Sequence, residues 1–257
     1  MGEIHDTIDN RNISINNVGI TDYVVSFTFK DGRKKYHTIA NIKSGVSVDK
    51  NTKGAHLSRI NMTIDELISN KELNISDLIN VAKELSKNVG VNNANIKVCF
   101  TIVFQVKTPQ TLLTTNMHSN IELYVNVKDN KVVDNYISLS GNVGMLCPNS
   151  KSKSRYGAHS QKCNIVLTLY DNIDDIIIFD YYKKLCMSGS APVFGVVRSD
   201  DESYMTELAY DNPKFSEDAV RDLIISVRKD FEDGRIKVEL KNLESIHQHN
   251  VFCIGED

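Results

Sequence analysis

A thiol and an imidazole lie twelve positions apart in the polar stretch CPNSKSKSRYGAHSQ, as Cys147 and His159. Lys151, Lys153 and Arg155 lie between them. A thiolate and an imidazole held by a fold can bind zinc, manganese or iron, and a catalytic metal site leaves one position open for water. Nearby cations can receive an anion, and the plainer alternative is a polar surface loop. The spacing of these residues alone is compatible with all three.

An acidic stretch, DDESYMTELAYDNPKFSE, runs from Asp200 to Glu217 and offers Glu202 as a further metal ligand. Near its end, a buried Glu217 carboxylate could accept the two N–H donors on one edge of a guanine. The alternative is a solvated loop that leads into a helix N-terminus, where Glu217 and Asp218 interact favourably with the helix dipole. That alternative by itself accounts well for Glu217.

A third stretch, NLESIHQH, places His247 and His249 one residue apart. If this segment is extended, both imidazoles point to the same face. Glu244 lies three residues before His247, so its carboxylate could orient an imidazole. The alternative is a polar strand end with no ligand role.

Length and composition exclude several classes of protein. The 257 residues are 41% hydrophobic and 25% charged with a net charge of −3, which is typical of a globular protein that needs neither a nucleic acid nor a membrane surface as partner. No apolar run approaches the ~20 residues of a membrane span. The five cysteines are odd in number and form no CxxC pair, and no signal peptide precedes them, so we expect a cytoplasmic protein.

Hydrophobic periodicity and turn residues predict the order of the elements. We expect a hairpin at Asp31-Gly32, a helix whose capping box is Thr63 and Glu66, and a helix that Ser76 begins and Gly90 ends. The remaining predicted elements are strands 97–107, 121–128, 131–139, 163–170 and 235–241, a helix over 171–185, and a helix that begins at Ser216 and ends at Gly234.

This order, strands then two helices then strands, lacks the alternation of a parallel sheet and predicts an antiparallel α+β fold. A loose arm over residues 1–18 precedes a first unit over 19–145 and a second over 146–257. Both units show strands flanking helices, although no sequence identity links them.

Four blocks in the same order resemble type IB GTP cyclohydrolases over nearly the full length of the chain. They are KGAHLSR (53–59), LCPNSK with YGAHSQK (146–162), DDESYMTELAYDNPKFSEDAVRD (200–222) and NLESIHQH (242–249). The resemblance implies a tandem pair of tunnelling-fold units, each an antiparallel sheet backed by two helices. It implies a homotetramer with active sites at subunit interfaces. It also implies hydrolytic opening of the GTP imidazole ring, with release of formate and formation of 7,8-dihydroneopterin triphosphate for folate-type pterins or deazaguanines.

The resemblance also assigns roles to residues of this sequence. One divalent metal, whose identity as zinc, manganese or iron stays open, would be bound by Cys147, His159, Glu202 and His247. With Cys147 and His159, His249 and Glu244 would serve catalysis through proton transfer. Glu217 matches the carboxylate that anchors the purine, and the candidates for phosphate and ribose contacts are Arg198, Lys162, Arg59 and His56.

Several departures mark the chain as a divergent member of that family. Asn149 replaces the second cysteine of the usual CPCSK, and Lys162 replaces an arginine. Ala191 replaces a cysteine, Phe194 a tyrosine and Ser199 an arginine, so one cation of the phosphate site is missing. Three alternatives therefore stay open: an archaeal-type relative that makes the 2′,3′-cyclic phosphate, a paralogue that acts on another purine nucleotide, and a purine-binding protein without catalysis.

Overall fold

The computed structural model describes residues 4–257, which form two compact units. The first unit contains the chain up to Thr101, Ile121–Ile137 and Asp171–Ile176, and the second contains Ile102–Asn120, Ser138–Tyr170 and Ile177–Asp257. Three long strands contribute residues to both units, so the units interleave along the sequence. The first three residues of the predicted N-terminal arm lie outside the described residues.

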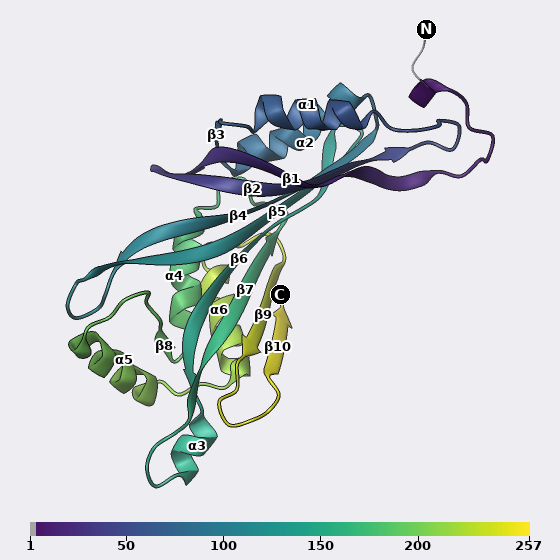
Figure 1. The fold of residues 1–257 in the computed structure, drawn as a ribbon. Coiled ribbons are helices and arrows are strands. Elements are labelled where there is room, and N and C mark those ends of the chain that lie inside the picture. Colours follow the sequence, from purple (N-terminus) through teal and green to yellow (C-terminus); the bar gives the residue numbers. More distant parts are fainter. Residues whose placement is uncertain (1–3) are drawn as a thin grey trace. The chain divides into compact units, whose positions relative to one another are not determined.

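The elements that contribute residues to the first unit run from the N-terminal part of the chain to the third long strand (Figure 1). They are η1 (Ile4–Asp6), β1 (Ile15–Asp31), β2 (Lys34–Val48), α1 (Leu57–Leu67), β3 (Glu72–Leu73), α2 (Ile75–Val89), β4 (Asn93–Lys107), β5 (Thr114–Lys128) and β6 (Lys131–Leu146).

The first unit is a sheet with the strand order β3-β1-β2-β4-β5-β6, backed by α1 and α2 (Figure 1). β1 pairs with β2, and β2 with β4, in antiparallel register, while the two-residue β3 adds a short parallel pairing to β1. Burial alternates along these strands, so one face packs on the helices, as expected for an antiparallel sheet. Phe27, Phe29 and Phe100 form an aromatic cluster there, with ring centroids 5.0–6.5 Å apart.

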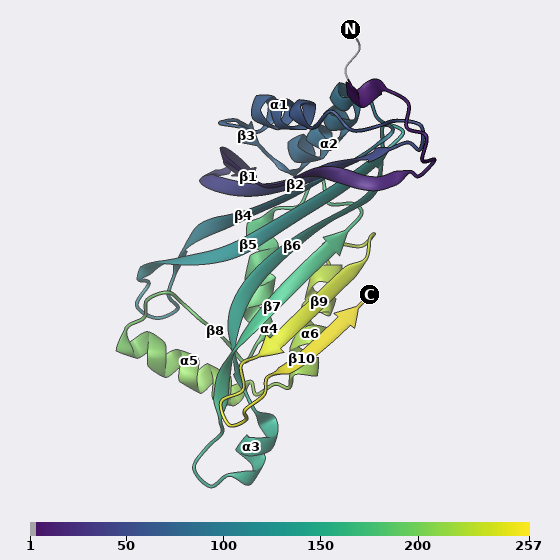
Figure 2. The same cartoon turned by 45° about the vertical axis from the view of Figure 1, so that its right-hand side comes forward.

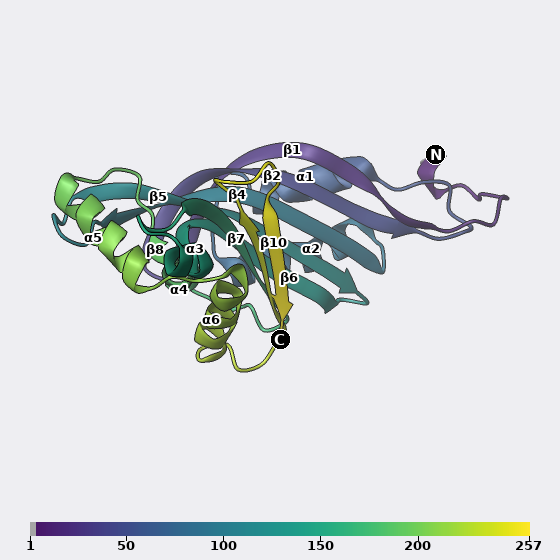
Figure 3. The same cartoon turned by 90° about the horizontal axis from the view of Figure 1, so that it is seen from below.

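The second unit adds eight elements to the ends of the long strands. They are α3 (Pro148–Lys153), β7 (Ser160–Tyr170), α4 (Ile178–Ser188), β8 (Ala191–Pro192), α5 (Ser199–Asp211), α6 (Ser216–Arg228), β9 (Ile236–Asn242) and β10 (Val251–Glu256). Its strand order is β10-β9-β7-β6-β5-β4, and β8 pairs with β6. Figures 2 and 3 show α6 beside β9 and β10, and α4 packs against α6. The second unit is thus also a sheet backed by a helix pair, which confirms the predicted α+β class.

Helix boundaries are where the sequence prediction was least accurate. α1 begins at Leu57, so Thr63 is buried inside the helix and the predicted capping box of Thr63 with Glu66 is wrong. α2 begins after Asn74, whose side chain accepts a hydrogen bond from the Asp77 amide while Asp77 reciprocates, so the N-cap is Asn74 and not Ser76. The predicted end at Gly90 is confirmed, since Gly90 has a left-handed φ of 76°.

The second unit shows the same kind of error. The predicted helix over 171–185 begins only at Ile178, and Asp171, with a left-handed φ of 71°, lies outside it. The predicted cap at Ser216 is wrong, since the N-cap of α6 is Phe215 and Ser216 is the first helical residue; α6 ends at Arg228, six residues before Gly234. The acidic stretch 200–217 is not the solvated loop that one of the two alternatives predicted, because most of it forms α5.

No helix within residues 4–257 combines the length and the apolar character needed to cross a membrane.

Candidate active site

Asn242 marks the place in the second unit where three strands bring the candidate residues together. It is the last residue of β9, and it pairs with Cys163 of β7 on one side and with Val251 of β10 on the other. His159 lies just before the paired part of β7, and the loop 243–250 with Glu244, His247 and His249 follows Asn242 directly. The register of β7, β9 and β10 therefore gathers two separate sequence blocks at one end of these strands.

The start of α6 is tied to the same point. The buried Asn242 amide donates a hydrogen bond from Nδ2 to Oγ of Ser216, the first residue of α6, over 2.8 Å. Glu217 is the next residue of the helix, so this bond sets where its carboxylate lies. Burial raises the pKa of the Cys253 thiol, and the nearby negative charge of Glu217 raises that pKa further. α6 and β10 therefore approach one another at Glu217 and Cys253, beside the residues gathered at the end of β7 and β9.

Cys147 and His159 are held together by a short ring of hydrogen bonds. The Cys147 N–H donates to the His159 carbonyl over 3.2 Å, and the His159 N–H donates to Ser150 Oγ over 3.2 Å. The Ser150 N–H in turn donates to Cys147 Sγ over 3.4 Å, because Cys147 is the N-cap of α3. The sulfur of Cys147 is thus held at the first turn of α3, where it faces the Ser150 amide.

The imidazole rings are oriented by neighbours from the same end of the strands. His159 Nδ1 lies 2.9 Å from Gln161 Oε1 and 3.5 Å from Ser245 Oγ. The rings of His247 and His249 stack, with centroids 5.0 Å apart and planes 16° apart. The segment that carries them is a bend and not an extended strand, so the two rings share a side for a different reason from the one that the sequence predicted.

A cavity of about 290 Å³ collects six of the predicted residues. They are Cys147, His159, Glu217, Glu244, His247 and His249, and Gln161, Lys214 and Asn242 also line it. Lys214 is anchored by hydrogen bonding to the Ser188 carbonyl and by an ion pair with Asp222. The cavity is thus polar, with a thiol, three imidazoles and two carboxylates facing one space.

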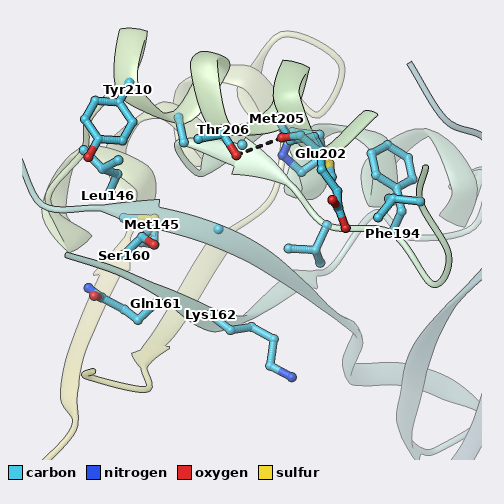
Figure 4. A pocket seen from close by; sticks show the side chains of 16 residues that line it. Met145, Leu146, Ser160, Gln161, Lys162, Phe194, Glu202, Met205, Thr206 and Tyr210 are labelled. Atoms are coloured by element: carbon cyan, nitrogen blue, oxygen red, sulfur yellow. Dashed lines mark hydrogen bonds between the residues drawn. The ribbon is translucent and has the colours of Figure 1, made fainter. Parts of the chain in front are cut away.

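Glu202 and Lys162 line a different cavity of about 680 Å³ in the same unit (Figure 4). Glu202 projects from α5, on the side of the cavity where Phe194 lies, and Lys162 lies on β7 beside Gln161. Gln161 lines both cavities, so they border one another along this side chain. The structure therefore does not place Glu202 with the other three predicted metal ligands.

α5 is fixed by Asp201, a fully buried carboxylate next to Glu202. Asp201 accepts hydrogen bonds from the amides of Gln110, Thr111 and Arg198 and from the Thr111 hydroxyl. Burial raises the pKa of this carboxyl, but the hydrogen bonds outweigh it and hold the pKa well below its ordinary value of 3.8. Arg198 is exposed at the N-cap of α5, and its side chain lines neither of these two cavities.

His56 and Arg59 lie together in the first unit, in a third cavity of about 330 Å³. This cavity lies where α1 begins and α2 ends, and Asp49 and Asn92 also line it. No acidic residue occupies the first turn of α1, and its N-terminal amides carry partial positive charge. The end of α1 together with Arg59 can therefore receive an anion.

The donors in the 290 Å³ cavity fit a divalent metal of the zinc, manganese or iron class. A thiol at the start of α3 and imidazoles, of which that of His159 is held through one ring nitrogen, are the ligand types that such ions take. Among the described residues, no three His, Cys, Asp or Glu side chains are already gathered at metal-binding distances.

Most of the departures from the family pattern lie away from the polar cavity. Ala191 and Phe194 line the 680 Å³ cavity, and Ser199 begins α5. Asn149 is exposed on the first turn of α3, two residues from Cys147. Asn149 is thus the departure that stands nearest in sequence to the thiol.

A search of solved structures shows which fold this is. The crystal structure of uricase from Arthrobacter globiformis matches 94% of this chain and 92% of that chain, with a TM-score of 0.52 at 7% sequence identity. The two units, each a sheet backed by a helix pair, therefore define a tandem tunnelling-fold protein.

The sequence places the chain more narrowly. Residues 1–253 match the family described as type I GTP cyclohydrolase folE2. The GTP cyclohydrolase FolE2 of Thermosipho africanus is 30% identical over 260 residues, covering 100% of this chain and 98% of that protein. That of an Azoarcus species is 31% identical over 257 residues, covering 99% and 94%. The chain belongs to the type I GTP cyclohydrolase FolE2 family, as its four sequence blocks predicted.

The residues that hold these side chains in place were not predicted from the sequence. Gln161 and Asn242 stood inside the quoted blocks but received no role. An asparagine that ends a strand of alternating residues was the available signal for Asn242, because a buried amide needs a partner. Asp201 was masked by its acidic neighbours, which are exposed.

Proposed function

We propose that this protein is an enzyme that opens the imidazole ring of GTP by hydrolysis. C8 leaves as formate, and the remainder rearranges to 7,8-dihydroneopterin triphosphate. Family membership supports the reaction. One observation supports its location: Cys147, His159, His247 and His249 face the carboxylates of Glu217 and Glu244 across one cavity.

We assign the metal to Cys147, His159 and His247, with Glu202 as the fourth ligand. When bound, a divalent metal lowers the pKa of a coordinated water toward neutrality and so makes a nucleophile available at C8. Because Glu202 lines the neighbouring cavity, α5 or the 243–250 loop must shift for all four to bind together. The Ser150 N–H, which donates to Cys147 Sγ, would remain a donor to the sulfur when it binds the metal.

The other side chains of the cavity bind the substrate and move protons. Glu217 accepts the N1–H and amino group of the guanine, a two-donor contact that a carboxylate matches in geometry. We assign His249, which stacks on His247, and Glu244, which lines the same cavity, to proton delivery to the ring nitrogen that is released when the imidazole opens.

We assign the triphosphate and the ribose to cations outside the polar cavity. Lys162 lies on β7 beside Gln161, and Arg198 precedes the acidic turn of α5. His56 and Arg59 line a cavity of the first unit that offers helix N-terminal amides as well.

We further propose a homotetramer whose active sites lie at subunit interfaces. β10 ends the strand order of the second unit, and Val251, Phe252 and Ile254 on it are exposed, with Phe252 at 77%. An exposed apolar edge strand is a surface that pairs with another chain. Light scattering after size-exclusion chromatography measures the mass of the assembly. A mass four times that of the monomer supports the homotetramer, and any other mass contradicts it.

The test of the activity is anaerobic incubation of the purified protein with GTP and Mn²⁺ or Fe²⁺. We expect formate in the solution and, after oxidation, a fluorescent pterin that carries three phosphates. Formate with a cyclic phosphate product points to the archaeal-type reaction, and turnover of a different purine nucleotide points to a paralogue. Tight GTP binding with no formate under any metal contradicts an enzymatic role.

A further inference from the structure

The His159 ring has a hydrogen-bond arrangement that assigns one of its two nitrogens. Nδ1 lies 2.9 Å from Gln161 Oε1, and an amide oxygen can only accept a hydrogen bond. A neutral His159 ring that makes this hydrogen bond therefore carries its proton on Nδ1. Nε2 is then left with its lone pair, which is the form of imidazole that binds a metal.

The backbone of His159 is already fixed without Gln161. Its N–H donates to Ser150 Oγ and its carbonyl accepts from the Cys147 N–H, so the main chain at this point cannot turn. What these bonds leave free is the rotation of the ring and the choice of tautomer. Gln161 lies two residues on, on the same side of the chain, and its amide controls both.

Ser245 approaches the same nitrogen from the other sequence block. Its Oγ lies 3.5 Å from Nδ1, a longer contact than that of Gln161. A hydroxyl can donate as well as accept, so Ser245 alone would permit either tautomer. Gln161 is therefore the neighbour whose hydrogen bond selects one tautomer of the neutral ring.

We propose that Gln161 is a positioning residue that holds His159 as its Nδ1–H tautomer, with Nε2 presented to the metal. This inference rests on the proposed function, because it concerns the metal site named there. Changing a partner that orients a ligating histidine weakens metal binding by roughly 10–100-fold in other proteins. Gln161 also lines the 680 Å³ cavity. The alternative is that its side chain only lines this cavity and has no effect on the His159 ring.

The first experiment needs no metal. Histidine ¹⁵N shifts of the metal-free full-length protein, at a pH where the rings are neutral, report which nitrogen of His159 carries the proton. We expect Nδ1–H in the unaltered protein and a mixture of tautomers in Gln161→Leu. An Nε2–H ring in the unaltered protein overturns the proposal, whatever the metal site does.

The second experiment measures metal affinity with Co²⁺, whose charge-transfer band reports a bound thiolate. We expect Gln161→Leu to weaken Co²⁺ binding about tenfold or more. Gln161→Glu keeps an acceptor at this place and adds a negative charge, so it should bind Co²⁺ at least as tightly as the unaltered protein, to within about threefold. Gln105→Leu, an exposed glutamine on β4, is the matched control and should change nothing.

The outcomes separate the positioning role from the metal site itself. Equal Co²⁺ affinity in Gln161→Leu and the unaltered protein overturns the role of Gln161, and so does an equal loss in Gln161→Leu and Gln161→Glu. If the unaltered protein shows no Co²⁺ charge-transfer band, the proposed metal site is wrong. The tautomer measurement then still tests the hydrogen bond between Gln161 and His159.

Discussion

The two units are built alike, yet their cavities carry different chemistry. In the first unit, the cavity at the ends of α1 and α2 is lined by His56 and Arg59, with no thiol. In the second unit, a cavity at the ends of β7, β9 and α6 is lined by a thiol, three imidazoles and two carboxylates. A repeated fold fixes where cavities form, while loops and helix starts decide what they do. This contrast predicts that substitutions of the proposed metal and proton-transfer residues in the second unit affect turnover, while substitutions in the first unit affect only substrate binding.

The largest effect is expected at Cys147. Cys147→Ala removes the proposed thiolate ligand, so we expect loss of the bound metal and a drop in turnover of at least about 10³-fold. Metal analysis and formate release measure both. Cys99→Ala, in the first unit, is the matched thiol control and should keep the metal and most of the activity. A Cys147→Ala protein that retains both would remove the proposed site.

The next largest effect is expected at Glu217. Glu217→Gln replaces one acceptor with a donor opposite the guanine N–H groups, so kcat/KM for GTP should fall by about 100-fold. Asp218→Asn changes the neighbouring carboxylate and should cost less than about threefold. Steady-state kinetics decide, and equal losses in the two variants would mean that Glu217 acts only through the helix dipole.

Stability provides a comparison between the helix starts of the two units. Asn242→Leu breaks the buried bond to Ser216, and we expect a loss of about 2 kcal/mol in the free energy of unfolding. Asn74→Ala removes the exposed cap of α2 and should cost about 1 kcal/mol. Urea unfolding gives both values. The reverse order would show that the second unit does not depend on Asn242 to join α6 to β9.

A smaller effect is expected from Arg59 in the first unit. Arg59→Ala should raise KM for GTP about tenfold with kcat nearly unchanged, because a phosphate contact made equally in the ground state and transition state affects only binding. Arg33→Ala, at the β1–β2 turn, is the control. A fall in kcat without a change in KM would assign Arg59 to the reaction and weaken the contrast between the units.

The smallest effect is confined to alkaline pH. Burial raises the pKa of the Cys163 thiol to about 12, from an ordinary value of 9.0. A raised pKa means that the folded state disfavours the thiolate, so this stability is complete below pH 9 and declines as the pH rises from about 9 toward 12. Unfolding free energies at several pH values should fall less steeply for Cys163→Ala than for the unaltered protein. Parallel slopes would show that Cys163 contributes nothing to alkaline sensitivity.

The sequence predicted the repeated sheets and helix pairs well because their apolar residues recur with clear periods. The buried face of α2, from Leu78 to Val89, follows that period. The helix starts were wrong where a polar residue had two interpretations: Thr63 fits a cap by pattern, yet tertiary packing buries it in mid-helix. α5 was missed as a helix because its apolar stripe is weak and its first turn is anchored by Asp201, a contact with residues about 90 positions away.

Some residues of the candidate site could be predicted from the sequence and others could not. Cys147, His159, His247 and Glu217 could be proposed from residue type and resemblance, because their chemistry is visible in the sequence. Their separation from Glu202 could not be predicted, since it depends on where α5 lies against β8, which in turn pairs with β6. The supporting amides of Gln161 and Asn242 were equally hidden, because the role of an amide depends entirely on its partner.

The first turn of α3 has a consequence for oxidation. Cys147 caps this turn, and Asn149 stands where the family pattern has a second cysteine. A chain with cysteines at both positions could form a disulfide within this turn. Here Cys147 has no neighbouring thiol on α3. We expect that a sulfenic acid formed on Cys147 by peroxide finds no second thiol within α3 with which to form a disulfide. Its reduction would then depend on a thiol from outside α3.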